Sequence, residues 1–200
     1  MAESNPSGAR CALILAAGMG TRMKSHLAKV LHPLLGWPMV RFPVAAAQAS
    51  GLDVTLVVHH QEEAVRSAMD GLDVGFARQE SPRGTGDAVA SGLTALPESG
   101  LVVVMAGDAP LFRAQTLQTL LAAHDEDAGV TVLTAVVDDA ARYGRLVRDA
   151  ECRPLRIVEA SEATPEELAI REINTGAYVF DIAFLRRSLP TLKPHAHKQE

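Results

Sequence analysis

Short apolar runs alternate with amphipathic stretches along the first two thirds of the chain. Runs at residues 12–16, 54–58, 74–77, 101–105 and 130–137 are too short for helices and predict buried strands. Between them, residues 37–49, 61–69, 87–96 and 115–124 predict helices. Alternation with short connections is typical of a doubly wound α/β fold with a mostly parallel, Rossmann-like sheet, in which ligands bind beyond the carboxyl ends of the strands.

Two of the predicted helices have candidate starting residues. Pro38 suits the first turn of the helix over 37–49, whereas Pro43 should kink or delay that helix. Asp87 can cap the helix over 87–96, because its carboxylate accepts hydrogen bonds from the unpaired N–H groups of a first turn.

The alternation ends after residue 137. Residues 145–148, 155–158 and 177–180 predict strands joined by turns, and residues 182–189 predict a closing helix. We therefore expect a small mixed or antiparallel extension of the sheet. Residues 1–10 are polar and predict a flexible lead-in, so we expect one domain over residues 11–200.

Composition excludes several classes of protein. The chain has 200 residues, of which 48% are hydrophobic, which is enough for a sizeable core. Its net charge of -5 argues against a nucleic-acid-binding surface. No apolar run approaches the roughly 20 residues needed to cross a bilayer, and the N-terminus lacks the pattern of a signal peptide. Cys11 and Cys152 are far apart and predicted to be reduced, which indicates a cytoplasmic protein.

A glycine loop with nearby cations follows the first predicted strand. Gly18 and Gly20 allow the backbone to turn sharply and to present several N–H groups to one anion. Arg22, Lys24 and Lys29 add positive charge within a few residues. This combination predicts a site for a polyphosphate, and an ordinary turn with solvated basic residues is the alternative.

Two common phosphate-binding loops do not fit this segment. Met23 stands where the dinucleotide-binding fingerprint needs its third glycine. Met23 also precedes Lys24-Ser25, where a Walker A loop needs glycine. The loop therefore belongs to neither class, and the remainder of the chain must decide between the alternatives.

Asp108 is the first charged residue after an uncharged run that begins at Leu101. A carboxylate at the end of a buried strand suits Mg²⁺, which prefers oxygen ligands and keeps several waters. Alternatively, Asp108 caps the helix that follows, which is a common use of aspartate after a strand.

A second glycine loop, over residues 84–86, leads into a predicted helix N-terminus, where unpaired N–H groups attract acceptor atoms. Gln79 precedes this loop and carries both a donor and an acceptor, which suits the edge of a nucleobase. The alternative is a flexible connection. Polar residues at 143–145, 159 and 173–176 interrupt or follow the later strands in the same way.

Together these motifs closely resemble the sugar nucleotidyltransferase family, in particular the N-terminal uridylyltransferase (pyrophosphorylase) domains of bacterial GlmU enzymes, which supply UDP-N-acetylglucosamine as a cell-wall precursor. The resemblance runs from residue 12 to residue 180. Residues 15–23 match sugar nucleotidyltransferases generally, and residues 29–32 and 173–176 match this branch; the other matching segments are 84–86, 107–111, 143–145 and 157–159. The resemblance implies a nucleotide-diphospho-sugar transferase fold, Mg²⁺ as cofactor, and transfer of UMP from UTP to N-acetylglucosamine 1-phosphate.

The resemblance also implies roles for individual residues on the nucleotide side. Arg22 and Lys29 would bind the phosphates, and Asp108 would bind Mg²⁺; these three are the expected catalytic residues. Gln79, Gly84 and Thr85 would read the uracil. The substrate-binding set implied on this side is Leu15, Ala16, Ala17, Gly18, Gln79, Gly84, Thr85, Ala106 and Gly107.

The amino-sugar phosphate would be held by three further residues. By the resemblance, Gly144 contributes its backbone, and the side chains of Glu159 and Asn174 face sugar hydroxyls and the N-acetyl group. No histidine or cysteine is expected to be catalytic, because a sugar phosphate oxygen is already an anionic nucleophile near neutral pH.

Four features depart from the family pattern. Ala28 stands in place of a proline, Asp87 in place of a histidine, and Ala106 at a position that is often larger. The family's second Mg²⁺ ligand, an asparagine, has no clear counterpart in residues 193–200; if Glu200 matches that segment's glutamate, the asparagine falls on Ala196.

The missing ligand and the end of the chain keep alternatives open. We expect a nucleotidyltransferase domain that is truncated or shortened at its C-terminus, without the hexapeptide-repeat acetyltransferase domain of GlmU. The alternative functions are a nucleotide-sugar-binding module with weak or no turnover, and a related nucleotidyltransferase with another base or sugar. The partners expected are UTP and an amino-sugar 1-phosphate, with neither nucleic acid nor membrane.

Overall fold

The computed structural model describes residues 8–20, 23–81 and 83–192 of the chain. These residues form two compact units: the first extends to Thr131 and resumes at Tyr178, and the second spans Val132–Ala177. The predictions made for Arg22 and for the segment 193–200 lie outside the described residues.

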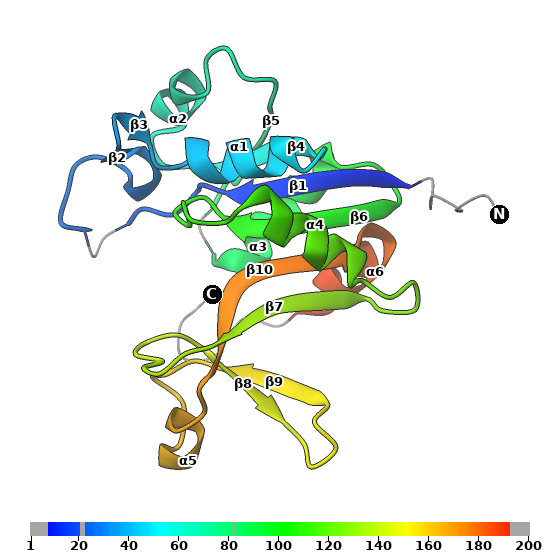
Figure 1. The fold of residues 1–200 in the computed structure, drawn as a ribbon. Coiled ribbons are helices and arrows are strands. Elements are labelled where there is room, and N and C mark those ends of the chain that lie inside the picture. Colours follow the sequence, from blue (N-terminus) through cyan, green and yellow to red (C-terminus); the bar gives the residue numbers. More distant parts are fainter. Residues whose placement is uncertain (1–7, 21–22, 82, 193–200) are drawn as a thin grey trace. The chain divides into compact units, whose positions relative to one another are not determined.

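The first unit is built on a mostly parallel sheet (Figure 1). Its strands are β1 (Ala9–Leu15), β4 (Asp53–Val58), β5 (Gly75–Arg78), β6 (Gly100–Ala106) and the last residues of β10 (Glu172–Asp181), in the order β5-β4-β1-β6-β10. β1 is parallel to both neighbours and β4 is parallel to β5, whereas β10 is antiparallel to β6. The predicted α/β fold class is therefore confirmed.

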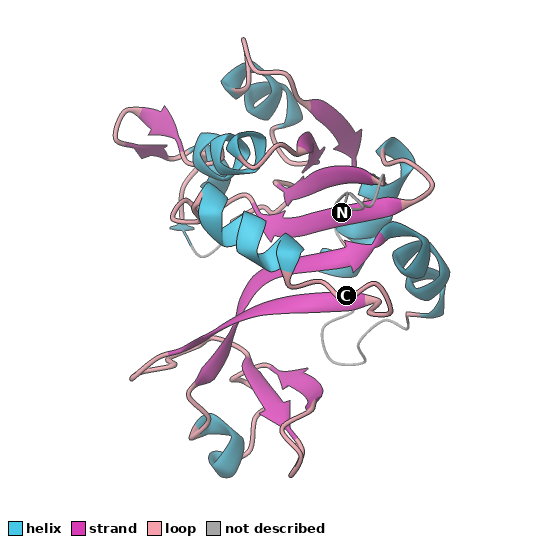
Figure 2. Cartoon of the chain, turned by 45° about the vertical axis from the view of Figure 1, so that its right-hand side comes forward, coloured by secondary structure: helices cyan, strands magenta, loops and turns pink. Residues whose placement is uncertain are grey.

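Helices cover both faces of this sheet (Figures 1 and 2). In Figure 1, α1 (Arg41–Ala49) and α4 (Ala114–Ala122) lie over one face, and α3 (Thr85–Gly92) and α6 (Ile182–Ser188) lie over the other. Helix α2 (Glu62–Ala68) packs mainly against the turn over Lys29–Leu31. Ala12, Leu13 and Ile14 of β1 are all fully buried, as expected for a strand covered on both sides. Among the described residues, no helix has the length and apolarity needed to span a membrane.

Helix α3 approaches β1 so closely that one position must lack a side chain. A Cβ at Gly92 would lie 2.5 Å from Leu13 Cδ1 and 2.6 Å from Leu13 Cδ2. We expect Gly92→Ala to lower the free energy of unfolding by about 2 kcal/mol, because such overpacking outweighs the better helix propensity of alanine. Denaturant unfolding measures the change.

A compensating variant supplies the control for this packing prediction. Leu13→Ala alone should also destabilise the protein, by about 2–5 kcal/mol, because it leaves a cavity. In the double variant the added methyl group partly fills that cavity, so the two losses should not add. An unfolding free energy for Gly92→Ala equal to that of the wild type would show that α3 and β1 are not in close contact there.

The second unit is antiparallel. It contains β8 (Arg145–Arg148), β9 (Pro154–Val158), the short helix α5 (Pro165–Leu168), the first residues of β10, and most of β7 (Val130–Val136), which pairs with β10. β8 runs antiparallel to both β9 and β10. Arg148 and Glu172 form a two-point ion pair between β8 and β10, and this hydrogen bonding holds the pKa of Glu172 below its ordinary value. The predicted antiparallel extension is confirmed.

The predicted helix over 37–49 begins later than expected. Trp37–Pro38 form strand β3, which pairs with β2 (Pro33–Leu34) in a hairpin. Both turn residues have positive φ, 51° at Leu35 and 83° at Gly36, as a tight two-residue hairpin requires. Helix α1 starts at Arg41, so Pro43 lies in its first turn, where a missing N–H costs no hydrogen bond.

The predicted cap at Asp87 is wrong. Helix α3 starts two residues earlier, at Thr85, with Gly84 at the N-cap position and φ 105°. That conformation favours glycine, so the glycine loop itself opens the helix. Asp87 lies in the first turn instead, and its carboxylate is available to other partners.

Candidate active site

Those of the predicted nucleotide-side residues that the structure describes gather where parallel strands of the first unit end. Loops leave β1 after Leu15 and β6 after Ala106, and two hydrogen bonds tie them to neighbouring strands. Ala16 N donates to Val57 O at 2.8 Å, and Gly107 N donates to Leu15 O at 2.9 Å. The site therefore lies at the carboxyl edge of the sheet, where ligands of this fold bind.

The two glycines after β1 serve different purposes. Gly20 has φ 62°, and a Cβ there would lie 2.7 Å from Lys29 Cβ, so the loop contacts Lys29 directly. At Gly18, no described atom lies within 4 Å of the Cβ position. Within the described residues, packing therefore gives no reason for the absence of a side chain at Gly18, and the open space leaves its backbone approachable by a ligand.

Lys29 and Asp108 form an ion pair beside this loop. Lys29 begins a one-turn 3-10 helix, Lys29–Leu31, and the other two residues of that turn are buried. Asp108 follows β6, and it does not cap α4, whose N-cap residue is Arg113. The capping alternative for Asp108 is thereby excluded. The side chains of Lys29 and Asp108 are 42% and 30% exposed, so a substrate can reach both.

The Asp108 carboxylate could hold Mg²⁺ only together with oxygen ligands from a substrate. Within the described residues, no group of three or more His, Cys, Asp or Glu side chains could hold a metal ion. Mg²⁺ is commonly held by one or two carboxylates plus substrate phosphates and waters. The Asp108 carboxylate already forms an ion pair with one cation, the Lys29 ammonium group.

Gln79 lies buried at the end of β5, with 3% of its surface exposed. Its backbone N–H donates to Val58 O at 2.8 Å, and its side-chain Nε2 donates to Asp87 Oδ2 at 2.8 Å and to Gly84 O at 3.4 Å. Both acceptors can only accept, so the amide nitrogen must face them. The group that Gln79 can offer to a nucleobase is therefore its side-chain oxygen, Oε1.

Two contacts around Gln79 were not apparent from the sequence. His59 Nδ1–H donates to the backbone carbonyl oxygen of Gln79 at 2.7 Å, although the adjacent residues His59 and His60 belong to no recognisable motif. Arg83 Nη2 lies 3.2 Å from Asp87 Oδ1 and partly balances that carboxylate's charge. Asp87, which departs from the family pattern, thus acts as an acceptor for two donors.

The three predicted amino-sugar residues meet within the second unit. A Cβ at Gly144 would lie 3.1 Å from Ile157 Cγ2 and 3.5 Å from Glu159 Oε1, so the chain passes Glu159 closely. Asn174 N donates to Gly144 O at 2.9 Å, and Asn174 Oδ1 accepts from Gly176 N at 3.1 Å. Three segments that are separate in the sequence thus converge.

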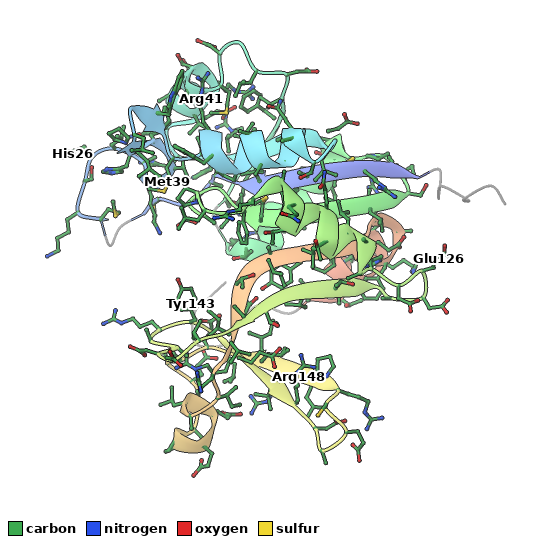
Figure 3. The ribbon with its side chains drawn as sticks, in the orientation of Figure 1. His26, Met39, Arg41, Glu126, Tyr143 and Arg148 are labelled. Atoms are coloured by element: carbon green, nitrogen blue, oxygen red, sulfur yellow. The ribbon has the colours of Figure 1, made fainter. Side chains whose placement is uncertain are left out.

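A buried arginine holds the loop that precedes Gly144. Arg145 is 3% exposed, and its guanidinium donates to Ala140 O at 3.2 Å, to Ala141 O at 3.0 Å and to Tyr143 O. Ala141 has φ 39°, a conformation that costs energy for a residue with a side chain. Tyr143, labelled in Figure 3, is 56% exposed. Arg145 thus stabilises a strained turn from within.

An open surface pocket of about 590 Å³ lies elsewhere in the first unit. Its lining includes Asp53, Thr55, Asp73 and Gly75, at the amino ends of β4 and β5. This is the edge of the sheet opposite to the loops described above. None of the predicted substrate residues lines it.

Comparison with known proteins identifies close relatives. The family profile of the MobA-like NTP transferase domain matches residues 12–175. Proteins named bifunctional protein GlmU from Pelobacter propionicus and Trichlorobacter lovleyi are 49% and 50% identical to the chain, each over 90% of it and 40% of the relative. A protein of the same name from an Exiguobacterium species is 50% identical over 86% of the chain and 39% of the relative. The chain thus spans about two fifths of the length of these relatives.

A solved structure shares the fold at low sequence identity. It is a Bacillus anthracis protein named as a glucose-1-phosphate thymidylyltransferase, in complex with a sucrose. The TM-score is 0.75 at 21% identity, and the match covers 96% of this chain and 79% of the other. This likeness supports the fold described above.

Proposed function

Because this chain belongs to the family of MobA-like NTP transferase domains, we propose that it transfers UMP from UTP to N-acetylglucosamine 1-phosphate, giving UDP-N-acetylglucosamine and pyrophosphate. The main structural support for this type of reaction is the Lys29–Asp108 ion pair beside the glycine loop after β1. The choice of substrates follows the relatives named GlmU, of which the chain spans about 40%.

The reaction requires positioning and charge rather than an acid or a base. The second pKa of a phosphate monoester is about 6, so the sugar phosphate oxygen is an anionic nucleophile near neutral pH. This oxygen forms a bond to the α-phosphorus of UTP, while the bond from that phosphorus to the bridging oxygen breaks and pyrophosphate leaves with the electron pair. The obstacle is repulsion between two anions, which Lys29 and the loop N–H groups would reduce.

Asp108 would hold Mg²⁺ together with the triphosphate. When bound, the ion supplies positive charge at the phosphoryl oxygens. Lys29 would then be released from its contact with Asp108 and would be free to bind a phosphate oxygen. Arg22 is proposed as a second phosphate-binding cation on the resemblance alone, since it lies outside the described residues.

The base and the sugar would be recognised in separate places. With its amide nitrogen occupied by Asp87 and Gly84, Gln79 would accept a hydrogen bond through its oxygen. Uracil has an N–H at its pairing edge, whereas cytosine has an acceptor there, so this arrangement favours uracil. Gly144, Glu159 and Asn174, which meet in the second unit, would hold the amino sugar.

Release of pyrophosphate tests the proposal. With Mg²⁺, we expect the highest kcat/KM for the pair UTP and N-acetylglucosamine 1-phosphate, compared with CTP and dTTP and with glucose 1-phosphate. Calorimetric titration of UTP runs in parallel. UTP binding without any pyrophosphate would favour a nucleotide-binding module without turnover, and faster reaction of another pair would overturn the substrate assignment.

A further inference from the structure

Gln61 connects the start of α2 to the loop that precedes Lys29. Its side-chain Oε1 accepts from Ala28 N at 2.9 Å, and its Nε2 donates to His26 O. One side chain thus binds the backbone on both sides of Leu27. His26, labelled in Figure 3, lies on the loop between β1 and β2.

The backbone next to Lys29 differs in exposure from one residue to the next. Leu27 N donates to Ser25 Oγ at 3.1 Å, and Leu27 is 39% exposed. Ala28, by contrast, is 1% exposed, so its N–H needs a protein partner, because an unpaired buried donor is costly. The bond to Gln61 therefore fixes the residue that immediately precedes Lys29.

Gln61 makes these contacts from an unfavourable local conformation. It has φ 52°, in the left-handed region that residues with side chains rarely occupy. It also stands at the N-cap position of α2, yet its side chain makes no capping hydrogen bond to that helix. A residue that is strained locally and directed at a distant loop indicates a functional constraint.

We propose that Gln61 is a positioning residue that acts through Lys29: it anchors the amino end of the Lys29–Leu31 turn, so that the ammonium group lies beside the glycine loop and Asp108. The buried Val30 and Leu31 anchor the other end of the same turn. The inference rests on the proposed function, because it assigns the phosphate contact to Lys29.

The test is a set of kinetic variants. Gln61→Ala should lower kcat/KM for UTP roughly tenfold, since a small misplacement of a charged group is costly in the transition state. The KM for the sugar phosphate should not change. In a Lys29→Ala background, Gln61→Ala should have no further effect, because the residue through which it acts is gone. If Gln61→Ala still lowers kcat/KM for UTP roughly tenfold in the Lys29→Ala background, the proposal is overturned.

Proline at position 28 provides a rescue. Ala28 has φ -55°, which proline adopts, and proline has no N–H to satisfy. In an Ala28→Pro background, Gln61→Ala should therefore cost much less than tenfold in kcat/KM. An undiminished cost would show that Gln61 does not act through this backbone segment.

A matched control separates positioning from general stability. Gln48 Nε2 donates to Asp73 O at 2.9 Å, away from the site, so Gln48→Ala should change no kinetic constant. Hydrogen exchange at residues 26–28 should rise in Gln61→Ala, a readout that needs no turnover. If the wild type releases no pyrophosphate, the proposed function fails, whereas unchanged exchange in Gln61→Ala contradicts the anchoring role itself.

Discussion

Asp108→Asn should reduce Mg²⁺-dependent release of pyrophosphate by about 10²–10³-fold. The substitution keeps the shape of the side chain but removes the negative charge proposed to hold the ion, and metal stabilisation of phosphoryl charge is worth several kcal/mol. Asp108 follows β6 and does not cap α4, so its loss should leave that helix intact.

Two further measurements make the Asp108 prediction specific. Binding of Mn²⁺ in the presence of UTP, followed by electron paramagnetic resonance, should weaken in Asp108→Asn. Glu126→Gln, on the exposed loop before β7, removes one carboxylate elsewhere in the first unit and should change neither turnover nor Mn²⁺ binding. Wild-type turnover in Asp108→Asn would remove this residue from the metal site.

Lys29→Ala should lower kcat/KM for UTP by about 10²–10³-fold, because it removes a fixed cation from the place where phosphate charge accumulates. The same change should alter the free energy of unfolding by less than about 1 kcal/mol, since the Lys29–Asp108 pair is partly exposed and such pairs contribute little to stability. Steady-state kinetics and denaturant unfolding measure the two effects.

A large kinetic loss with a small loss of stability is what distinguishes a substrate-binding role for Lys29 from a structural one. Arg187→Ala, on the exposed side of α6, also removes one positive charge and should leave kcat/KM unchanged. If Lys29→Ala unfolds the protein, or leaves kcat/KM at the wild-type value, the proposed phosphate contact is wrong.

Much of the fold could be predicted because most strands of the first unit are short, continuous runs of apolar residues in the sequence. The predicted family and the α/β fold class are confirmed. The predictions that failed concern helix starts, at Trp37 and Asp87. In both places the loop conformation decided the boundary: a hairpin with two positive φ angles delays α1, and Gly84 opens α3 before Asp87.

The site was only partly visible in the sequence. Motif spacing marks Lys29, Gln79 and Asp108 as candidates, since glycine loops and charged residues stand out at strand ends. Nothing marks Gln61, because it acts on backbone groups of a loop and leaves no residue pattern at its partner. Arg145 lies in the matching segment 143–145, but nothing in the sequence indicates that its guanidinium binds the backbone of Ala140 and Ala141.

The sequence by itself determined the alternation of the main strands and helices, the family, and the types of residue at the strand ends, because these depend on local periodicity and on short motifs. Only the tertiary structure decided which groups touch: Lys29 and Asp108, Gln79 and Asp87, and Gln61 and the loop before Lys29. These contacts join different loops, whose separation is determined by how the loops pack at the carboxyl edge of the sheet and not by any spacing along the chain.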